Sequence, residues 1–190
     1  ASERNDSSLV VQGEEERAPT YVITPLGAKV NRVYLVGVVS DLENVGTSEE
    51  PRWRAKLIDP TSTTYISAGQ FQQEAARAMS KLAVPSFAAV IGKVRVYSPE
   101  PDVMYITIAP ETIKPVDKMS RNIWVLVGCR SLKQRIEAAE EAAKLDEPTV
   151  EALVKLGYPN GLAEGIVAAK AHYGEVPLDS SMSIAATPAR

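Results

Sequence analysis

Basic residues alternate with apolar ones in two segments of the chain, residues 52–58 and 93–97. Because successive side chains of a β-strand point to opposite faces, this alternation places the basic side chains on one face and the apolar ones on the other. Cations can bind phosphates and flat rings can stack on bases, so such a face is typical of proteins that bind single-stranded nucleic acid. The basic and aromatic candidates for it are Arg52, Arg54, Lys56, Tyr65, Lys93, Arg95, Tyr97 and Tyr105.

The chain as a whole is not strongly basic. The candidate residues would also suit the exterior of an ordinary barrel strand without a binding role. The net charge is −3, and residues 21–118 contain 11 Lys and Arg against 10 Asp and Glu. The acidic residues of segment 41–50 would repel phosphate at one edge of the face. Trp53 alternates with the basic residues, so we expect it in the core. Any nucleic-acid binding must therefore be local, or shared with a partner.

No set of residues in the sequence has the composition of a catalytic or metal site. Cys129 and His172 are the only cysteine and histidine, whereas a structural zinc ion needs four ligands. Segment 157–165 contains glycines but lacks the Gly-Lys-Ser/Thr ending of a phosphate-binding loop. We therefore expect no catalysis, no metal and no cofactor. The sequence contains neither an apolar run of membrane-spanning length nor a signal-peptide pattern, so we expect a cytoplasmic protein without membrane contact.

The strand and helix patterns predict a mainly β fold. Five strands are expected at residues 30–39, 53–58, 63–67, 87–97 and 103–108, with loops at 41–51 and 98–102. A helix is expected at 70–82, with Phe71, Ala75, Ala78, Met79 and Leu82 on one side. Gly37 and Gly92 lie inside long strands, where a barrel strand bends sharply, and Pro110 limits how far the fifth strand continues. This order favours a five-stranded OB-fold barrel, with a helix between strands three and four, over an open sandwich.

Helical patterns dominate after Pro115. A long helix is expected over residues 118–144, at about 1.5 Å per residue roughly 40 Å long, although 123–127 alone would also suit a strand. Two short helices at 149–156 and 161–172 follow it. The predicted organisation is a disordered tail at 1–19, the OB-fold at 20–117, an assembly helix at 118–145, a small helical unit at 146–174 and a disordered tail at 175–190.

The long helix either covers its own barrel or pairs with helices of other chains. A helix of this length overhangs a small barrel, which favours pairing with other chains. Ile123 and Trp124 would then hold the helix on the barrel, and the apolar residues after them would form the seam. The predicted subunit interface consists of Trp124, Val127, Leu132, Ile136, Ala139 and Ala143.

Several short motifs in order resemble one family. Residues 24–33 (Thr-Pro-Leu-Gly-Ala-Lys-Val-Asn-Arg-Val) lead into the first strand, and 53–55 (Trp-Arg-Ala), 59–61 (Asp-Pro-Thr) and 68–72 (Ala-Gly-Gln-Phe-Gln) follow. They resemble the archaeal replication protein A-associated proteins over residues 21–143. The similarity to the middle subunit of eukaryotic replication protein A is weaker, and residues 149–172 are too short for the winged-helix domain that ends that subunit.

The resemblance implies a non-catalytic subunit that coats single-stranded DNA in replication, repair and recombination. Its implied partners are the large subunit of an archaeal replication protein A complex and a third OB subunit, together with the DNA. The large partner in that family often carries zinc, for which this chain has no ligand set. Two alternatives remain open on the sequence: a scaffold subunit with little direct DNA contact, and an RNA-binding OB protein, because the fold alone does not determine function.

Overall fold

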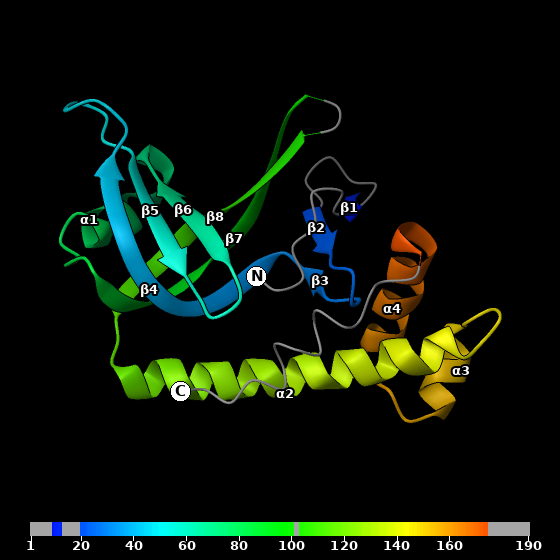
Figure 1. Cartoon of the computed structure of the whole chain (residues 1–190). Coiled ribbons are helices and arrows are strands. Elements are labelled where there is room, and N and C mark those ends of the chain that lie inside the picture. The colour runs from blue at the N-terminus through cyan, green and yellow to red at the C-terminus, as the bar shows by residue number, and fades with distance from the viewer. Residues whose placement is uncertain (1–8, 13–19, 101–102, 175–190) are drawn as a thin grey trace. The chain divides into compact units, whose positions relative to one another are not determined.

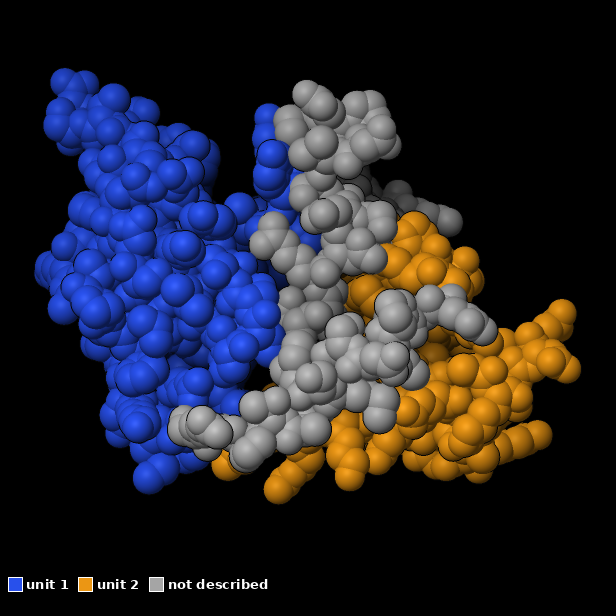
Figure 2. All heavy atoms as spheres, in the orientation of Figure 1, with its two compact units in different colours: residues 1, 32–125 blue, residues 2–31, 126–190 orange. Residues whose placement is uncertain are grey.

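The computed structural model describes residues 9–12, 20–100 and 103–174 (Figure 1). The predicted tails at residues 1–8, 13–19 and 175–190 lie outside the described residues. Within the predicted N-terminal tail, Leu9–Gln12 forms strand β1. The chain divides into two compact units, shown in two colours in Figure 2: a barrel unit of residues 1 and 32–125, and a second unit of residues 2–31 and 126–190.

The barrel unit is a closed five-stranded barrel, which confirms the predicted OB-fold. Its strands are β4 (Arg32–Asn44), β5 (Trp53–Ile58), β6 (Thr63–Ala68), β7 (Ser86–Glu100) and β8 (Val103–Pro115). They close in the order β4-β5-β6-β8-β7. All neighbouring pairs are antiparallel except β6 and β8, which are parallel. A short 3-10 turn η1 (Gln70–Gln72) and helix α1 (Gln73–Met79) connect β6 to β7 (Figure 1).

The barrel core consists of the apolar residues of the alternating strands and the buried side of α1. Ala55 and Leu57 of β5 are buried while Arg54, next to Ala55, is exposed, as the alternation predicts. Trp53 is partly buried and packs against this core, in agreement with the prediction. The buried set is Val39, Ala55, Leu57, Ile66, Ala68, Ala75, Ala76, Met79, Ala88, Val90, Ile108 and Ile113.

Gly92 and Pro110 lie together where the backbones of β7 and β8 approach closely. A Cβ on Gly92 would lie 2.5 Å from the carbonyl oxygen of Ala109, so only glycine permits this approach of the two backbones. Directly beside it the register shifts: Ile91 pairs with Thr112 and Gly92 with Pro110, which leaves Glu111 as an extra residue. A bulge of this kind accommodates proline. Contrary to the limit expected at Pro110, β8 therefore continues to Pro115.

Two strands also extend into segments predicted as loops. β4 continues to Asn44, whose side-chain oxygen accepts hydrogen bonds from the backbone N–H groups of Gly46 and Arg52, both at 3.0 Å. These bonds close the connection to β5 and keep the end of β4 in the ladder. β7 continues to Glu100 rather than ending at Tyr97, and residues 101 and 102 lie outside the described residues. In both strands the backbone pairing thus continues past the predicted end, to Asn44 opposite Trp53 and to Glu100 opposite Val103.

The second unit holds a small sheet and most of the helical part. The sheet contains β1, β2 (Thr20–Ile23) and β3 (Lys29–Val30), and the helices are α2 (Lys118–Ala143), α3 (Val150–Lys155) and α4 (Asn160–Tyr173). The first turns of α2, to Val125, belong to the barrel unit. Asp117 caps this helix: its carboxylate accepts the backbone N–H of Ser120 at 2.7 Å, a bond that lowers the pKa of Asp117. Segment 123–127 is helical, so its strand alternative is wrong.

Residues 20–31 were predicted as the start of the OB domain, but they belong to the second unit. Leu26 is buried against Leu132 and Ile136 of α2. The hydroxyl of Tyr173 donates a 2.7 Å hydrogen bond to the carbonyl oxygen of Ile23. The barrel unit therefore begins at Arg32, and Leu26 of the preceding segment is buried by α2.

The predicted small helical unit at 146–174 is not separate from α2. Leu153 of α3 and Ile166 of α4 share one core with Ala138 and Ala142 of α2. The ammonium of Lys170 donates to the carbonyl oxygen of Ala142 at 3.0 Å. The three helices α2, α3 and α4 therefore pack around one shared apolar core.

We expect Gly165→Ala to destabilise the second unit. A Cβ at Gly165 would overlap the carbonyl oxygen of Gly27, so the backbone would have to move. Overpacking of this kind lowers the free energy of unfolding by about 1–3 kcal/mol. The matched control is Gly161→Ala in the same helix, where nothing lies within 4 Å of the added carbon. Urea unfolding followed by circular dichroism measures both. Equal stability of the two variants would show that the close approach of Gly27 and Gly165 is not made.

Candidate nucleic-acid interface

A row of four side chains crosses four strands on the outside of the barrel. Lys56 of β5 pairs with Tyr65 of β6, Tyr65 pairs with Thr107 of β8, and Thr107 pairs with Arg95 of β7. The core residues of the barrel alternate with these positions, since Leu57, Ile66 and Ile108 beside them are buried. The row thus presents two cations, an aromatic ring and a hydroxyl on one exterior surface. We call this row, together with the outward residues Arg54, Lys93, Tyr97 and Tyr105 that flank it, the strand face.

The flanking positions of the strand face extend the same chemistry. Tyr97 pairs with Tyr105 across the β7–β8 hairpin, and their exposed fractions are 65% and 51%. On the other side of the row, Lys93 pairs with Ala109, and Arg54 pairs with Ser67. The structure therefore brings onto one surface cationic and aromatic side chains that are far apart in the sequence, from Arg54 to Tyr105. Arg52 lies just before β5 and is exposed.

The cations of the strand face differ in whether they already form an ion pair. The Nε of Arg54 donates to the carboxylate of Glu43 at 2.8 Å, and the guanidinium lies 5.8 Å from the centre of the Tyr65 ring. Both members of the Arg54–Glu43 pair are about half exposed, and such pairs are worth about 0–1 kcal/mol. By contrast, Lys56, Lys93 and Arg95 form no ion pair with any residue in the described ranges. An incoming anion would meet these three cations directly.

Two residues on or beside the strand face are not among the site residues predicted from the sequence. Thr107 stands between Tyr65 and Arg95, but a threonine in a strand has no distinguishing pattern. Phe71 was expected on the core side of a helix over 70–82, and this expectation is wrong. Residues 70–72 form a 3-10 turn before α1, and this change of winding turns the Phe71 ring outward, where 86% of it is exposed. The helical pattern of residues 70–82 contains no signal that separates this 3-10 turn from the helix that follows it.

The predicted subunit interface is divided by the structure. Leu132 and Ile136 are buried against Leu26 of the same chain, with Ala139 packed beside them, so they cannot face another chain. The indole N–H of Trp124 donates to the carbonyl oxygen of Tyr34 within the barrel unit, at 3.1 Å. Ala143 and Val127 are exposed. The correction follows from segment 20–31, which covers the face of α2 that the hydrophobic pattern had assigned to a partner.

Another side of α2 remains apolar and exposed. Met119, Ile123, Leu126 and Val127 recur at spacings of four, three and one, which places them on one side of the continuous helix. Their exposed fractions are between 55% and 65%. We call these four residues the α2 stripe. Exposed apolar residues that cluster in this way are typical of interaction surfaces.

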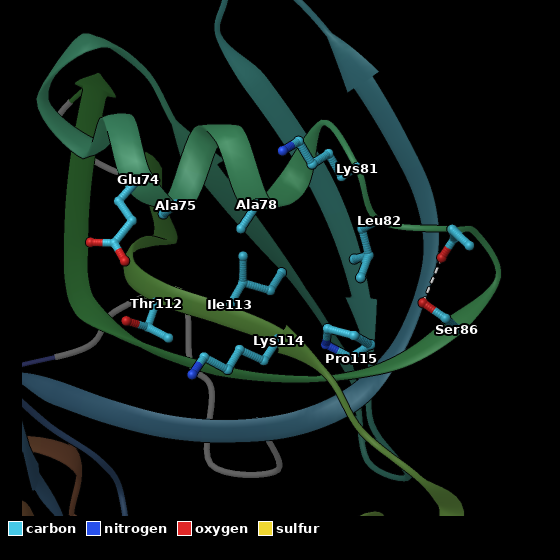
Figure 3. A pocket seen from close by; sticks show the side chains of 11 residues that line it. Glu74, Ala75, Ala78, Lys81, Leu82, Ser86, Thr112, Ile113, Lys114 and Pro115 are labelled. Atoms are coloured by element: carbon cyan, nitrogen blue, oxygen red, sulfur yellow. Dashed lines mark hydrogen bonds between the residues drawn. The ribbon is translucent and has the colours of Figure 1, made fainter.

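A cavity of about 510 Å³ lies between α1 and the last residues of β8, outside the strand face (Figure 3). Its wall is mainly apolar, with Ala75, Ala78, Leu82 and Ile113, and Lys81 and Lys114 lie at its edge. Within the described residues, no cluster of three His, Cys, Asp or Glu side chains could hold a metal ion. No helix of the described part of the chain is long and apolar enough to cross a membrane.

The chain is structurally similar to single-stranded-DNA-binding OB proteins at low sequence identity. One is the second single-stranded-DNA-binding protein of Mycobacterium smegmatis, at 13% identity and a TM-score of 0.39, over 48% of this chain and 89% of that chain. Another is a chain of a replication protein A heterotrimer bound to single-stranded DNA, at 15% identity and a TM-score of 0.40, over 60% and 80%. The chain is also structurally similar to the OBody NL8, solved bound to hen egg-white lysozyme, at 16% identity and a TM-score of 0.38, over 46% of this chain and 94% of that chain.

The class of fold rests on the order of the strands and on the closure of the barrel, which define this chain as an OB-fold protein. Comparison of the sequence with protein-family models and with curated proteins finds no match.

Proposed function

We propose that this protein is a non-catalytic, cytoplasmic subunit of a single-stranded-DNA-binding complex similar to replication protein A, acting in replication, repair and recombination. The observation that supports the proposal is the row Lys56–Tyr65–Thr107–Arg95 on the outside of the barrel. It combines cations that form no ion pair with the described residues and an exposed ring, and these are the two components that hold a single strand without reading its sequence.

The physics of binding follows from what each side chain offers. Tyr65 has 41% of its surface exposed and provides a face for a base, and one such stack is worth about 1–3 kcal/mol. Lys56, Lys93 and Arg95 neutralise phosphates without first breaking an ion pair. Arg54 would exchange Glu43 for a phosphate, and this exchange gains little because both anions are solvated. The three unpaired cations are therefore the main source of electrostatic affinity.

The low positive charge of this surface favours a subunit that shares its DNA with partners. The net charge of −3 gives the whole chain no long-range attraction for DNA. We propose that the α2 stripe binds the large subunit of the complex, with a third OB subunit completing it. The stripe is apolar, lies on a helix and is left uncovered by segment 20–31, so it replaces Leu132 and Ile136 in the interface expected from the sequence.

Replacing the unpaired cations of β7 tests direct DNA contact. We expect Lys93→Gln with Arg95→Gln to weaken binding to poly-dT. The slope of log K against log salt should fall by about 0.7 for each phosphate of the single strand that the protein no longer neutralises. The matched control is Lys81→Gln with Lys114→Gln, which removes the same charge from exposed lysines at the cavity edge. Fluorescence titration at several salt concentrations measures all three proteins.

An unchanged slope in the β7 variant would contradict direct contact and favour the scaffold alternative. The same titration with poly-U as a competitor addresses the RNA-binding alternative. A clear preference for poly-U over poly-dT would overturn the assignment to a DNA-binding complex. Equal or weaker competition by poly-U agrees with the proposal, because stacking and phosphate contacts without base reading distinguish the two polymers only weakly.

Glu43 should act as a local competitor of DNA. We expect Glu43→Gln to increase the affinity for poly-dT several-fold at low salt, because it frees the Arg54 guanidinium and removes one negative charge beside it. The gain should shrink above about 0.5 M salt as screening increases. Glu147→Gln changes the net charge equally, at an exposed position outside the barrel unit. A similar gain in both variants would show that only net charge matters.

The α2 stripe is tested by placing a charge on it. We expect Leu126→Glu to abolish co-purification with the large subunit, because a carboxylate in an apolar interface must be desolvated without a partner. Gln134→Glu is the control, since it adds the same charge at an exposed position of the same helix. Mass measurement of the mixed proteins in solution reports the complex. Retention of the complex by the Leu126 variant would remove the stripe from the interface.

A further inference from the structure

Phe71 is an aromatic side chain that the barrel holds in solvent. Its turn is fixed by two bonds: the backbone N–H of Gln72 donates to the carbonyl of Gly69 at 2.9 Å, and the Gln72 side chain accepts the N–H of Gly69 at 3.3 Å. The residue Phe71 is nevertheless 86% exposed. Burying a phenylalanine is normally favourable, so a ligand that covered this side chain would gain free energy from its burial.

The ring borders a groove of about 360 Å³ outside the barrel. The groove is also lined by Lys93 and Arg95 of β7 and by Ala109 and Pro110 of β8. It therefore has a flat aromatic surface, two cations and small apolar walls. All of these residues belong to the barrel unit, so the groove is complete within that unit.

The groove adjoins the strand face and shares two of its cations. Arg95 is the end of the row that begins at Lys56, and Lys93 pairs with Ala109, two residues past Thr107 on β8. Successive outward residues of a strand are about 6.6 Å apart. A nucleic-acid strand that lies over Tyr65 and Thr107 would therefore have to extend by only a few ångströms to reach the Phe71 groove.

The charges around the groove favour an anionic ligand. The groove contains two acidic residues, Glu74 and Glu111. The Nε of Arg32 donates to Glu111 at 2.7 Å and neutralises it, which leaves Glu74 against the unpaired Lys93 and Arg95. An apolar peptide would leave these two cations without partners, whereas a nucleotide satisfies the ring and the cations together.

We propose that Phe71 is a stacking platform for one nucleobase beyond the strand face, with the adjoining phosphate bound by Lys93 or Arg95. The inference rests on the proposed function and extends it: the bound strand runs from the strand face onto η1. Phe71 then increases the number of nucleotides that the protein covers. Stacking does not read sequence, so the effect is the same for every base type that can stack.

The test compares Phe71→Ala with the parent on dT oligonucleotides of about 4 and about 12 nucleotides, one at the lower end and one in the upper part of the usual range of site sizes for one OB-fold. On the longer oligonucleotide we expect affinity to fall by about 5- to 150-fold, which corresponds to the 1–3 kcal/mol of one base–aromatic stack. On the shorter one, which the strand face can hold alone, the two proteins should bind equally. Phe71→Tyr should restore the longer-oligonucleotide affinity, because its ring also stacks.

Val84→Ala is the control, since Val84 is an exposed apolar residue of the barrel unit that does not line the groove. Equal binding of the parent and Phe71→Ala to the long oligonucleotide, while Lys93→Gln with Arg95→Gln weakens it, would overturn the stacking platform and leave the proposed function standing. An equal decrease on both lengths would also overturn it, because the base would then not lie beyond the strand face. A parent that binds neither oligonucleotide would remove the proposed function and the platform together.

Discussion

The parallel pairing of β6 with β8 is the interaction on which the barrel and its surface depend. It joins Tyr65 to Thr107 and Ile66 to Ile108, and among the described strands of the barrel no other pair is parallel. Without it, β4, β5 and β6 would form one antiparallel group, joined only through β4 to the β7–β8 hairpin. The barrel would then be an open sheet with two exposed edges. Closure buries Ile66 and Ile108 and, on the outer side, brings Tyr65 within reach of Arg95.

Closing the barrel requires a close approach of two backbones and a bend in β8, and particular residues permit them. The backbones of β7 and β8 approach so closely beside Gly92 that a Cβ would overlap the carbonyl of Ala109. The bulge at Glu111 lets β8 bend there and continue. The same bulge places Glu111 where Arg32 can neutralise it. Strand curvature and the electrostatics of the Phe71 groove therefore have a common origin in this one irregularity.

The strand face is balanced between attraction and repulsion. Three of its cations are unpaired within the described chain, while Arg54 is held by Glu43 on the adjacent strand β4. A surface of this kind attracts phosphate locally but gives no strong field at long range. This balance agrees with the proposed role as one subunit of a larger DNA-binding assembly, and it explains how a chain of net charge −3 can present a cationic surface.

The sequence by itself determined the order of the strands, the intervening helix and the orientation of the alternating residues. Each of these is a local property: a period of two assigns Arg54 and Leu57 to opposite faces whatever the strand pairs with.

Only the tertiary structure decided which faces meet. The row from Lys56 to Arg95, the burial of Leu132 and Ile136 by Leu26, and the start of the barrel at Arg32 all join distant segments. A hydrophobic pattern shows that a side chain will be buried, but not against which residue, because the free energy of burial depends on the area removed from water and not on the identity of the neighbour. For the same reason the pattern could not show that one turn of 3-10 winding would turn Phe71 into solvent.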